Sequence, residues 1–334
     1  MPSRYAAAHV SPQGPGDARP TAEQIIQDEG VENKFTDKVF LITGCSSGIG
    51  IDTARTLAKT GAKLYLTVRD TTKAEKILSN ILKPGQVELI QMDLNSLDSV
   101  RAAVKTILSK SNKLNVLVEN AGILAEPGPE KFTKDGFESQ FGINHLAHFL
   151  LFDLLKDVLL ASSTPSFHSR VVIVASSEHR SSEILFGNYD FKTPGGQEYN
   201  NFIGYAQSKL ANLYMANEIE NLYGAKALHG LSLHPGGIGS GLHRNLDPNM
   251  VAGWKADPDL SKIFKTSSQG AATTVWAAVA KELEGKGRLY LENCQVAVSV
   301  KAGAGPGDTG YASYAFDKGK EHRLWVDSLK MVGL

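Results

Sequence analysis

Short apolar runs alternate with longer amphipathic stretches along this chain. The runs predict strands at residues 39–43, 62–68, 87–92, 114–118, 170–175, 228–234 and 287–291. Apolar residues at helical spacing predict helices at residues 49–62, 71–82, 96–111, 137–161, 205–223 and 267–283. Strands that alternate with helices of this length imply right-handed βαβ crossovers. We therefore predict an α/β fold with a doubly wound, seven-stranded parallel sheet and helices on both of its faces.

The first predicted strand ends in a glycine-rich turn, Thr-Gly-Cys-Ser-Ser-Gly-Ile-Gly from residue 43. Glycines permit a sharp turn and a close approach to a phosphate, and the following helix presents N–H groups and its positive dipole end. An ordinary strand–helix turn is the alternative. Its place between a clear strand and a clear helix favours a Rossmann-type dinucleotide site. The residues expected to contact the dinucleotide here are Gly44, Ser46, Ser47, Gly48, Ile49 and Gly50.

Composition narrows the choice of partner. The 334 residues include 35 basic and 35 acidic ones, and no basic stripe appears, so nucleic acid is excluded as a partner. Two cysteines cannot build a disulfide framework or a metal cluster, and no apolar run resembles a membrane span or a signal peptide. The histidines lack the spacing of metal ligands. We expect a cytoplasmic protein that binds a small molecule and no metal.

Tyr205 and Lys209 are four residues apart on a predicted helix and would share one of its faces. An ammonium group beside a phenol lowers the pKa of the phenol, which can then exchange a proton near neutral pH. A surface pair on an amphipathic helix is the alternative. Against it, a strand that ends in Ser176-Ser177 precedes this helix, and a nucleotide turn opens the fold.

Together these motifs resemble the short-chain dehydrogenase/reductase family over about residues 36–295. The resemblance is carried by the glycine turn, Asp93-Leu94, Asn120-Ala121-Gly122, Asn144, Ser176-Ser177, Tyr205-x-x-x-Lys209 and Pro235-Gly236. Residues 144–149, the insert before Tyr205 and residues 234–236 are most similar to the retinol-dehydrogenase-like and WW-domain-oxidoreductase-like branch. The C-terminal segment resembles fungal members. One departure is Glu119, which stands where the family usually has Asn.

The resemblance implies a catalytic role for four residues. Tyr205 would be the general acid in carbonyl reduction and the base in alcohol oxidation, and Lys209 would tune it and bind the nicotinamide ribose. Ser177 would hold the substrate oxygen, with Ser176 as the alternative, and Asn144 would bind a water that relays protons. The implied cofactor contacts are Asp93 and Leu94 near the adenine, Asn120, Ala121 and Gly122 on the adenosine side, Pro235 and Gly236 beside the nicotinamide, and Ile238 and Ser240 near its carboxamide.

The end of the second strand indicates the cofactor. A carboxylate there would bind the ribose hydroxyls of NAD, but Val68 occupies that place, and Arg69 follows with a guanidinium that suits a 2′-phosphate. Asp70 could bind the ribose or neutralise Arg69, although capping the next helix is its simpler role. We therefore predict NADP(H).

These inferences describe an NADP(H)-dependent oxidoreductase of ketones, aldehydes or secondary alcohols. We assign residues 1–35 to an N-terminal arm, predicted to be flexible up to residue 20 and to form a short helix from Thr21 to Glu29, with Thr21 as its N-cap and Gly30 as its stop. Residues 36–295 are assigned to a single catalytic domain with a lid at about 238–266, and residues 296–334 to a segment that covers the substrate pocket. Lid residues Leu242, Leu246, Met250, Val251 and Trp254 suggest a fairly large apolar substrate, with packing within the lid as the alternative. The fungal resemblance suggests a role in secondary metabolism. A non-catalytic nucleotide-sensing scaffold is the alternative. The predicted helices at residues 137–161 and 205–223 are each apolar on more than one side, which suggests contact with a second copy in a homodimer.

Overall fold

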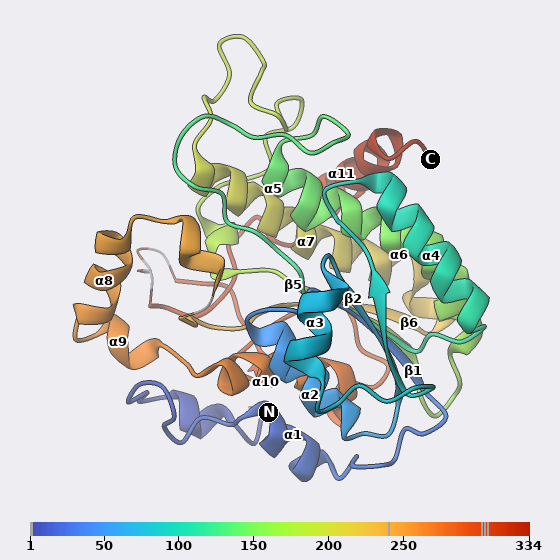
Figure 1. Cartoon of the computed structure of the whole chain (residues 1–334). Coiled ribbons are helices and arrows are strands. Elements are labelled where there is room, and N and C mark those ends of the chain that lie inside the picture. Colours follow the sequence, from blue (N-terminus) through green and yellow to red (C-terminus); the bar gives the residue numbers. More distant parts are fainter. Residues whose placement is uncertain (1–2, 240, 302, 304, 306) are drawn as a thin grey trace.

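The computed structural model describes residues 3–239, 241–301, 303, 305 and 307–334. At its centre lies one eight-stranded sheet in the order β3-β2-β1-β4-β5-β6-β7-β8, with helices on both faces (Figure 1). The strands are β1 (Val39–Thr43), β2 (Lys63–Val68), β3 (Val87–Gln91), β4 (Val116–Glu119), β5 (Ser169–Val174), β6 (Leu228–His234), β7 (Leu289–Glu292) and β8 (Gln295–Val296). Strands β1 to β7 are parallel, which confirms the predicted doubly wound sheet.

The eighth strand is an addition to the predicted seven. It consists of Gln295 and Val296 and pairs antiparallel with β7. A tight turn at Asn293 and Cys294 joins the two strands, and both turn residues have positive φ, 56° and 53°. That conformation matches the twist of a hairpin, but the turn contains no glycine and the strand is too short to show alternation. The apolar pattern therefore contained no sign of it.

Helices form a layer on each face of the sheet. The α-helices of the described chain are α1 (Ala22–Glu29), α2 (Ile49–Ala58), α3 (Thr71–Leu78), α4 (Leu97–Lys110), α5 (Ser139–Phe141), α6 (Ala147–Ser162), α7 (Asn201–Tyr223), α8 (Pro248–Ala256), α9 (Leu260–Ile263), α10 (Ser267–Val279) and α11 (Lys318–Met331). Helices α1, α2, α3 and α10 contribute to one apolar core, and α4, α6, α7 and α11 to the other (Figure 1). In the described part of the chain, no helix is long and apolar enough to cross a membrane.

The N-terminal segment is packed against the domain, which corrects the flexible arm that its composition predicts. Helix α1 begins after Thr21, whose side chain accepts a backbone hydrogen bond, and ends at Gly30, with a φ of 63°. Before it, the side chains of Tyr5 and Arg19 are buried. Arg19 donates hydrogen bonds to the backbone carbonyls of residues 262–264. Composition could not reveal this anchoring, because it depends on a single side chain and on partners far along the chain.

The C-terminal helix α11 covers the outer side of α6 and α7. The Trp325 ring centroid lies 4.8 Å from that of Phe149 and 5.9 Å from that of Phe152, both on α6. The buried carboxylate of Glu321 forms an ion pair with Arg288 at 2.9 Å, which fastens the other side of the helix. We predicted a second subunit from the outer apolar faces of α6 and α7. The same chain covers these faces with α11.

Candidate active site

The turn between β1 and α2 has the shape of a phosphate cradle. Gly44 has a φ of 74°, and a Cβ there would lie 2.8 Å from the Cβ of Ala121. A Cβ at Gly50 would lie 2.3 Å from the Gly44 carbonyl oxygen. Gly48 precedes α2 with a φ of 59°, and no described side chain caps the helix there. The uncapped N–H groups and the positive end of the helix dipole suit a pyrophosphate.

Thr43 and Asn120 connect this turn to the end of β4. The Thr43 Oγ1 accepts hydrogen bonds from the N–H groups of Asn120 at 2.9 Å and Ala121 at 3.0 Å. Asn120 Nδ2 donates to the Thr43 carbonyl oxygen at 2.8 Å. The Asn120 Oδ1 is buried without a hydrogen-bond partner among the described residues. A buried acceptor of this kind calls for a partner, and a bound dinucleotide fits here.

The other predicted cofactor residues follow the carboxyl ends of their strands at this edge of the sheet. They are Ser46, Ser47 and Ile49 after β1, Asp93 and Leu94 after β3, and Pro235, Gly236 and Ile238 after β6. Ser240 lies outside the described residues. Arg69 follows β2 with an exposed side chain, and Asp70 caps α3 by accepting the N–H of Lys73 at 2.9 Å. The simpler role expected for Asp70 is therefore the one it takes.

Tyr205 and Lys209 lie on one face of α7, and both are buried, with 6% and 3% of their surfaces exposed. The Lys209 Nζ is 5.6 Å from the centroid of the Tyr205 ring. It donates a hydrogen bond to the carbonyl oxygen of Val174, the last residue of β5, at 2.9 Å. Burial lowers the pKa of Lys209 to about 8.

The pKa of the Tyr205 phenol lies above its ordinary value, whereas the sequence argument expected the Lys209 ammonium to lower it. Burial is the largest cause and raises the pKa, a hydrogen bond with the Ser176 side chain lowers it, and the Glu178 carboxylate raises it. A phenol with a raised pKa stays protonated at neutral pH. This state suits a proton donor to a carbonyl oxygen.

The serine in contact with the Tyr205 phenol is Ser176, whereas the sequence prediction preferred Ser177. The side chain of Ser176 is buried and caps the short 3₁₀ helix that follows β5. Ser177 is the first residue of that helix, and its N–H donates to Nδ1 of His234 at 3.1 Å. The turn after β5 thus directs the first serine toward α7. The structure favours the alternative that the sequence had left open.

Asn144 lies in a π-helical turn, Gly142–Leu146, between α5 and α6. Its Oδ1 accepts the N–H of Ile123 at 2.8 Å, and its Nδ2 donates to the Ile123 carbonyl oxygen and the Ser208 hydroxyl, both at 3.0 Å. A Cβ at Gly122 would lie 3.4 Å from the Asn144 Oδ1 and 3.3 Å from the Lys209 Nζ. The absent side chain at Gly122 therefore keeps this corner of the site open. The proton-relaying water predicted for Asn144 stays a prediction.

Four histidines lie in this region, three of them buried and His234 half-buried. Burial is the main cause that lowers their pKa values, to about 3 for His145 and His234 and about 4 for His148 and His179. The Nε2 of His179 accepts the N–H of Ala312 at 3.1 Å, so its Nδ1 donates to the Ser176 carbonyl oxygen at 2.6 Å. Within the described ranges, no group of three or more His, Cys, Asp or Glu residues could hold a metal ion.

Glu119, the departure from the family pattern, ends β4 with a buried side chain. Neither carboxylate oxygen has a hydrogen-bond partner in the part of the chain that the structure describes. Burial raises the pKa of Glu119 well above its usual range, because an apolar interior disfavours the charged carboxylate. The adjacent Asn120 keeps its contacts with Thr43.

An apolar cluster packs around the Tyr205 ring. Its other members are Leu124, Phe202, Leu242, Leu246, Val251 and Trp254. Four of these come from the lid, as predicted from the sequence, whereas Met250 is 38% exposed. Leu124 and Phe202 were not predicted. Phe202 precedes Tyr205 by three residues on the same helix, and this spacing was the signal that could have identified it.

The turn after β6 is joined to the end of the lid. Gly236 has a φ of 106°, and a Cβ there would meet the Lys265 side chain at 2.8 Å. The Lys265 Nζ donates to the Pro235 carbonyl oxygen at 3.2 Å. A cavity of about 700 Å³ lies next to this turn, with Gly48 and Ile238 in its wall. The glycine cradle, the orphaned Asn120 oxygen and this cavity together fit a dinucleotide.

Comparison with known proteins identifies the family. The family described as short chain dehydrogenase matches residues 38–190. The short-chain dehydrogenase/reductase prx1 of Penicillium roqueforti is 51% identical over 331 residues, which are 99% of this chain and 95% of that protein. The WW domain-containing oxidoreductase of Homo sapiens is 36% identical over 286 residues, 83% of this chain and 66% of that protein. The chain belongs to the short-chain dehydrogenase/reductase family of oxidoreductases, which confirms the predicted resemblance.

Solved structures agree with this assignment. An uncharacterized protein from Mycobacterium paratuberculosis matches with a TM-score of 0.66 and 31% identity, over 89% of this chain and 93% of that one. The Pseudomonas aeruginosa RhlG/NADP active-site complex matches with a TM-score of 0.58 and 20% identity, over 76% of this chain and 94% of that one. The second match shows the shared fold alone.

Proposed function

We propose that this protein is an NADP(H)-dependent oxidoreductase that transfers a hydride between nicotinamide and a carbonyl or alcohol carbon of a fairly large apolar substrate. The observation that carries the proposal is the position of the Tyr205 phenol. It contacts the Ser176 side chain, shares a helix face with Lys209, and is packed within the apolar cluster that the lid completes. A proton donor inside an apolar cluster, on the helix that follows the carboxyl end of β5, suits a hydrophobic ketone, aldehyde or secondary alcohol.

The nicotinamide, when bound, supplies or accepts the hydride. Ser176 holds the substrate oxygen with its hydroxyl, and Tyr205 gives its phenolic proton to that oxygen during reduction. Lys209 places a positive charge beside the phenol, which stabilises the phenolate that remains after proton transfer. In the reverse direction the phenolate takes the proton from the alcohol.

Arg69 supports NADP(H) as the cofactor. Its side chain is exposed after β2, where the adenosine ribose would lie, and Asp70 is engaged in capping α3. The buried Val68 offers no carboxylate for the ribose hydroxyls. A guanidinium at this position suits the 2′-phosphate. Among solved structures with this fold, the RhlG complex holds NADP.

The biological role and the cellular compartment of the enzyme are also part of the proposal. A Penicillium relative of near full-length similarity supports a fungal enzyme, for which we propose a role in secondary metabolism. Two buried free cysteines support a reducing compartment such as the cytoplasm. The alternative, a nucleotide-sensing scaffold, would have no need of Ser176, Tyr205, Lys209 and Asn144 together.

The test mixes the protein with NADPH and a panel of hydrophobic ketones and aldehydes and follows the loss of reduced-nicotinamide absorbance. Tyr205→Phe is the matched control, because it keeps the ring and removes the proton donor. We expect its turnover to fall by about 10²–10⁴-fold, the usual contribution of general acid catalysis, while NADPH still binds. NADPH binding without turnover of any carbonyl by the wild type would favour the scaffold. Near-normal turnover by Tyr205→Phe would exclude the assigned acid.

A further inference from the structure

We propose that Arg19, in the N-terminal segment, is a positioning residue for the lid and for the turn after β6. The lid is residues 238–266, as defined above, and the turn is residues 235–238. The inference rests on the proposed function, in which this turn lies beside the nicotinamide. It assigns a role in the active site to a segment that precedes the residues matched by the family, 38–190.

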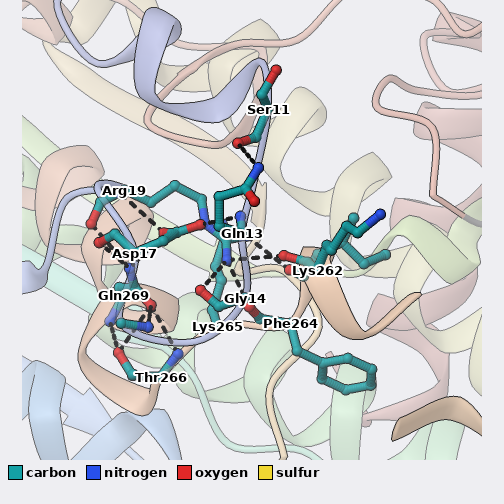
Figure 2. Close-up of polar contacts among 12 residues, drawn as sticks. Ser11, Gln13, Gly14, Asp17, Arg19, Lys262, Phe264, Lys265, Thr266 and Gln269 are labelled. Carbon is teal, nitrogen blue, oxygen red and sulfur yellow. Dashed lines mark hydrogen bonds and ion pairs between the residues drawn. The ribbon is translucent and has the colours of Figure 1, made fainter. Parts of the chain in front are cut away.

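The first step is the contact between Arg19 and the end of the lid, which Figure 2 shows. Arg19 is 4% exposed. Its Nη1 donates to the Ile263 carbonyl oxygen at 2.8 Å, and its Nη2 donates to those of Phe264 at 2.7 Å and Lys262 at 3.2 Å. These carbonyls lie where α9 ends, and carbonyls at a helix C-terminus lack partners within the helix. A guanidinium is therefore well matched to this end of the lid.

The second step fixes the arginine itself. Its Nε donates to Asp17 Oδ1 at 2.8 Å, and this ion pair is buried on both sides. Gln269, in the first turn of α10, donates its Nε2 to Asp17 Oδ1 and to the Arg19 carbonyl oxygen, both at 3.1 Å. The Gln269 Oε1 accepts the N–H groups of Gly16 and Thr266, both at 3.0 Å (Figure 2). The N-terminal segment is thus hydrogen-bonded to both sides of the junction between the lid and α10.

The third step leads from the end of the lid to the cofactor edge. Lys265 follows the carbonyls that Arg19 binds, and its N–H donates to the Gly237 carbonyl oxygen at 2.8 Å. Its Nζ, which is buried, donates to the Pro235 carbonyl oxygen at 3.2 Å and to Asn293 Oδ1 at 2.8 Å. Pro15 also lines the cavity beside Gly48. A continuous set of hydrogen bonds therefore runs from Arg19 to the turn after β6.

Removing the guanidinium would take this donor from four backbone carbonyls, those of Gly14, Lys262, Ile263 and Phe264, and would remove the ion pair with Asp17. Buried acceptors without partners are costly, so the end of the lid is expected to open more often. The turn after β6 would then lose the support of Lys265. The expected consequence is a weaker hold on the nicotinamide half of the cofactor, with the glycine turn unchanged.

The experiment compares Arg19→Met with Arg4→Met. Arg4 belongs to the same segment, but its side chain is 54% exposed and reaches Asp28 and Glu29. Limited trypsin digestion measures how often the lid opens, because trypsin cleaves after the exposed lid residues Lys255 and Lys262. We expect cleavage at these lysines to be about tenfold faster in Arg19→Met, which corresponds to roughly 1.4 kcal/mol. Cleavage at Lys105 and Lys110 on α4 is the internal control and should not change.

NADPH titration and steady-state kinetics supply the second measurement. In Arg19→Met, the dissociation constant and the KM for NADPH should rise by about tenfold. The kcat should fall less than threefold, and Arg19→Lys should recover part of the loss in affinity. Arg4→Met should behave as wild type in every assay. A uniform loss of stability would not separate KM from kcat in this way.

Each outcome bears on the proposal. Unchanged cleavage at Lys255 and Lys262 would overturn it, whatever the NADPH result. Equal acceleration at the α4 lysines would also overturn it, because Arg19 would then support the whole fold. If Arg19→Met does not fold, Arg19→Lys takes its place in the digestion. If the wild type does not bind NADPH, the proposed function fails, and the digestion still decides the role of Arg19.

Discussion

The Ser176 side chain lies beside the Tyr205 phenol and lowers its pKa, where the end of β5 meets the first turns of α7. His179 stabilises the backbone at Ser176, because its Nδ1 donates a hydrogen bond to the Ser176 carbonyl oxygen. Ser176 and Tyr205 must face the same substrate oxygen if the proposed reaction takes place. A donor fixed in this way needs little rearrangement when negative charge develops on that oxygen.

Ser176→Ala is therefore expected to lower kcat by about 10²–10³-fold, the usual effect of removing one such donor. Ser177→Ala is the matched control and should lose less than about threefold, because the contact of Ser177 with His234 is made by its backbone N–H. Turnover of any active carbonyl measures both. The reverse order of losses would restore Ser177 to the role that the sequence assigned to it.

Arg69→Ala should weaken NADPH binding by roughly 1.5–3 kcal/mol, the range for hydrogen bonds to charged groups. NADH binding should hardly change, because NADH has no 2′-phosphate. Titration of both reduced cofactors against wild type and variant, followed by fluorescence, measures the difference. Equal losses for the two cofactors would show that Arg69 does not read the 2′-phosphate.

The buried ammonium of Lys209 should appear in the pH dependence of stability. Its pKa is lowered by burial from 10.5 to about 8 in the folded protein. Between these two pH values the unfolded chain binds a proton that the folded chain has lost, so this residue makes the free energy of unfolding rise with pH. Below pH 8 its burial costs up to about 3 kcal/mol.

Lys209→Met should consequently abolish turnover. At pH 7 the variant should nevertheless unfold at a higher denaturant concentration than the wild type. The difference between variant and wild type should shrink as the pH rises from 8 to 10.5. Comparing the two proteins at each pH cancels the contribution of Lys265, whose pKa burial also lowers to about 8. A difference in unfolding free energy that does not vary with pH would show that Lys209 is not buried as an ammonium.

Helix α11 leads us to expect a monomer, in place of the dimer that the outer apolar faces of α6 and α7 suggested. Its Trp325 ring occupies the outer face of α6. Removal of residues 318–334 should expose that face and make the chain associate, which light scattering at micromolar concentration would detect. A dimer formed by the full-length chain, unchanged by the truncation, would place the subunit contact elsewhere.

The amino-acid sequence by itself determined the parallel sheet, the glycine turn and the pairing of Tyr205 with Lys209. Each of these depends on residues close together in the chain: apolar runs for buried strands, glycines where the backbone must take positive φ, and four-residue spacing on one helix. The capped helix between Thr21 and Gly30 is a further case, because both capping residues act on their own backbone.

Tertiary structure alone decided which of two adjacent serines contacts Tyr205, because the backbone after β5 sets the direction of each side chain. It also decided the sign of the Tyr205 pKa shift, since burial comes from surrounding residues and outweighs the lowering effect of the Ser176 side chain. The anchoring of Arg19 follows the same logic, because its carbonyl partners lie more than 240 positions away along the chain. Residues so distant meet through the fold, and no local pattern of residue types records that meeting.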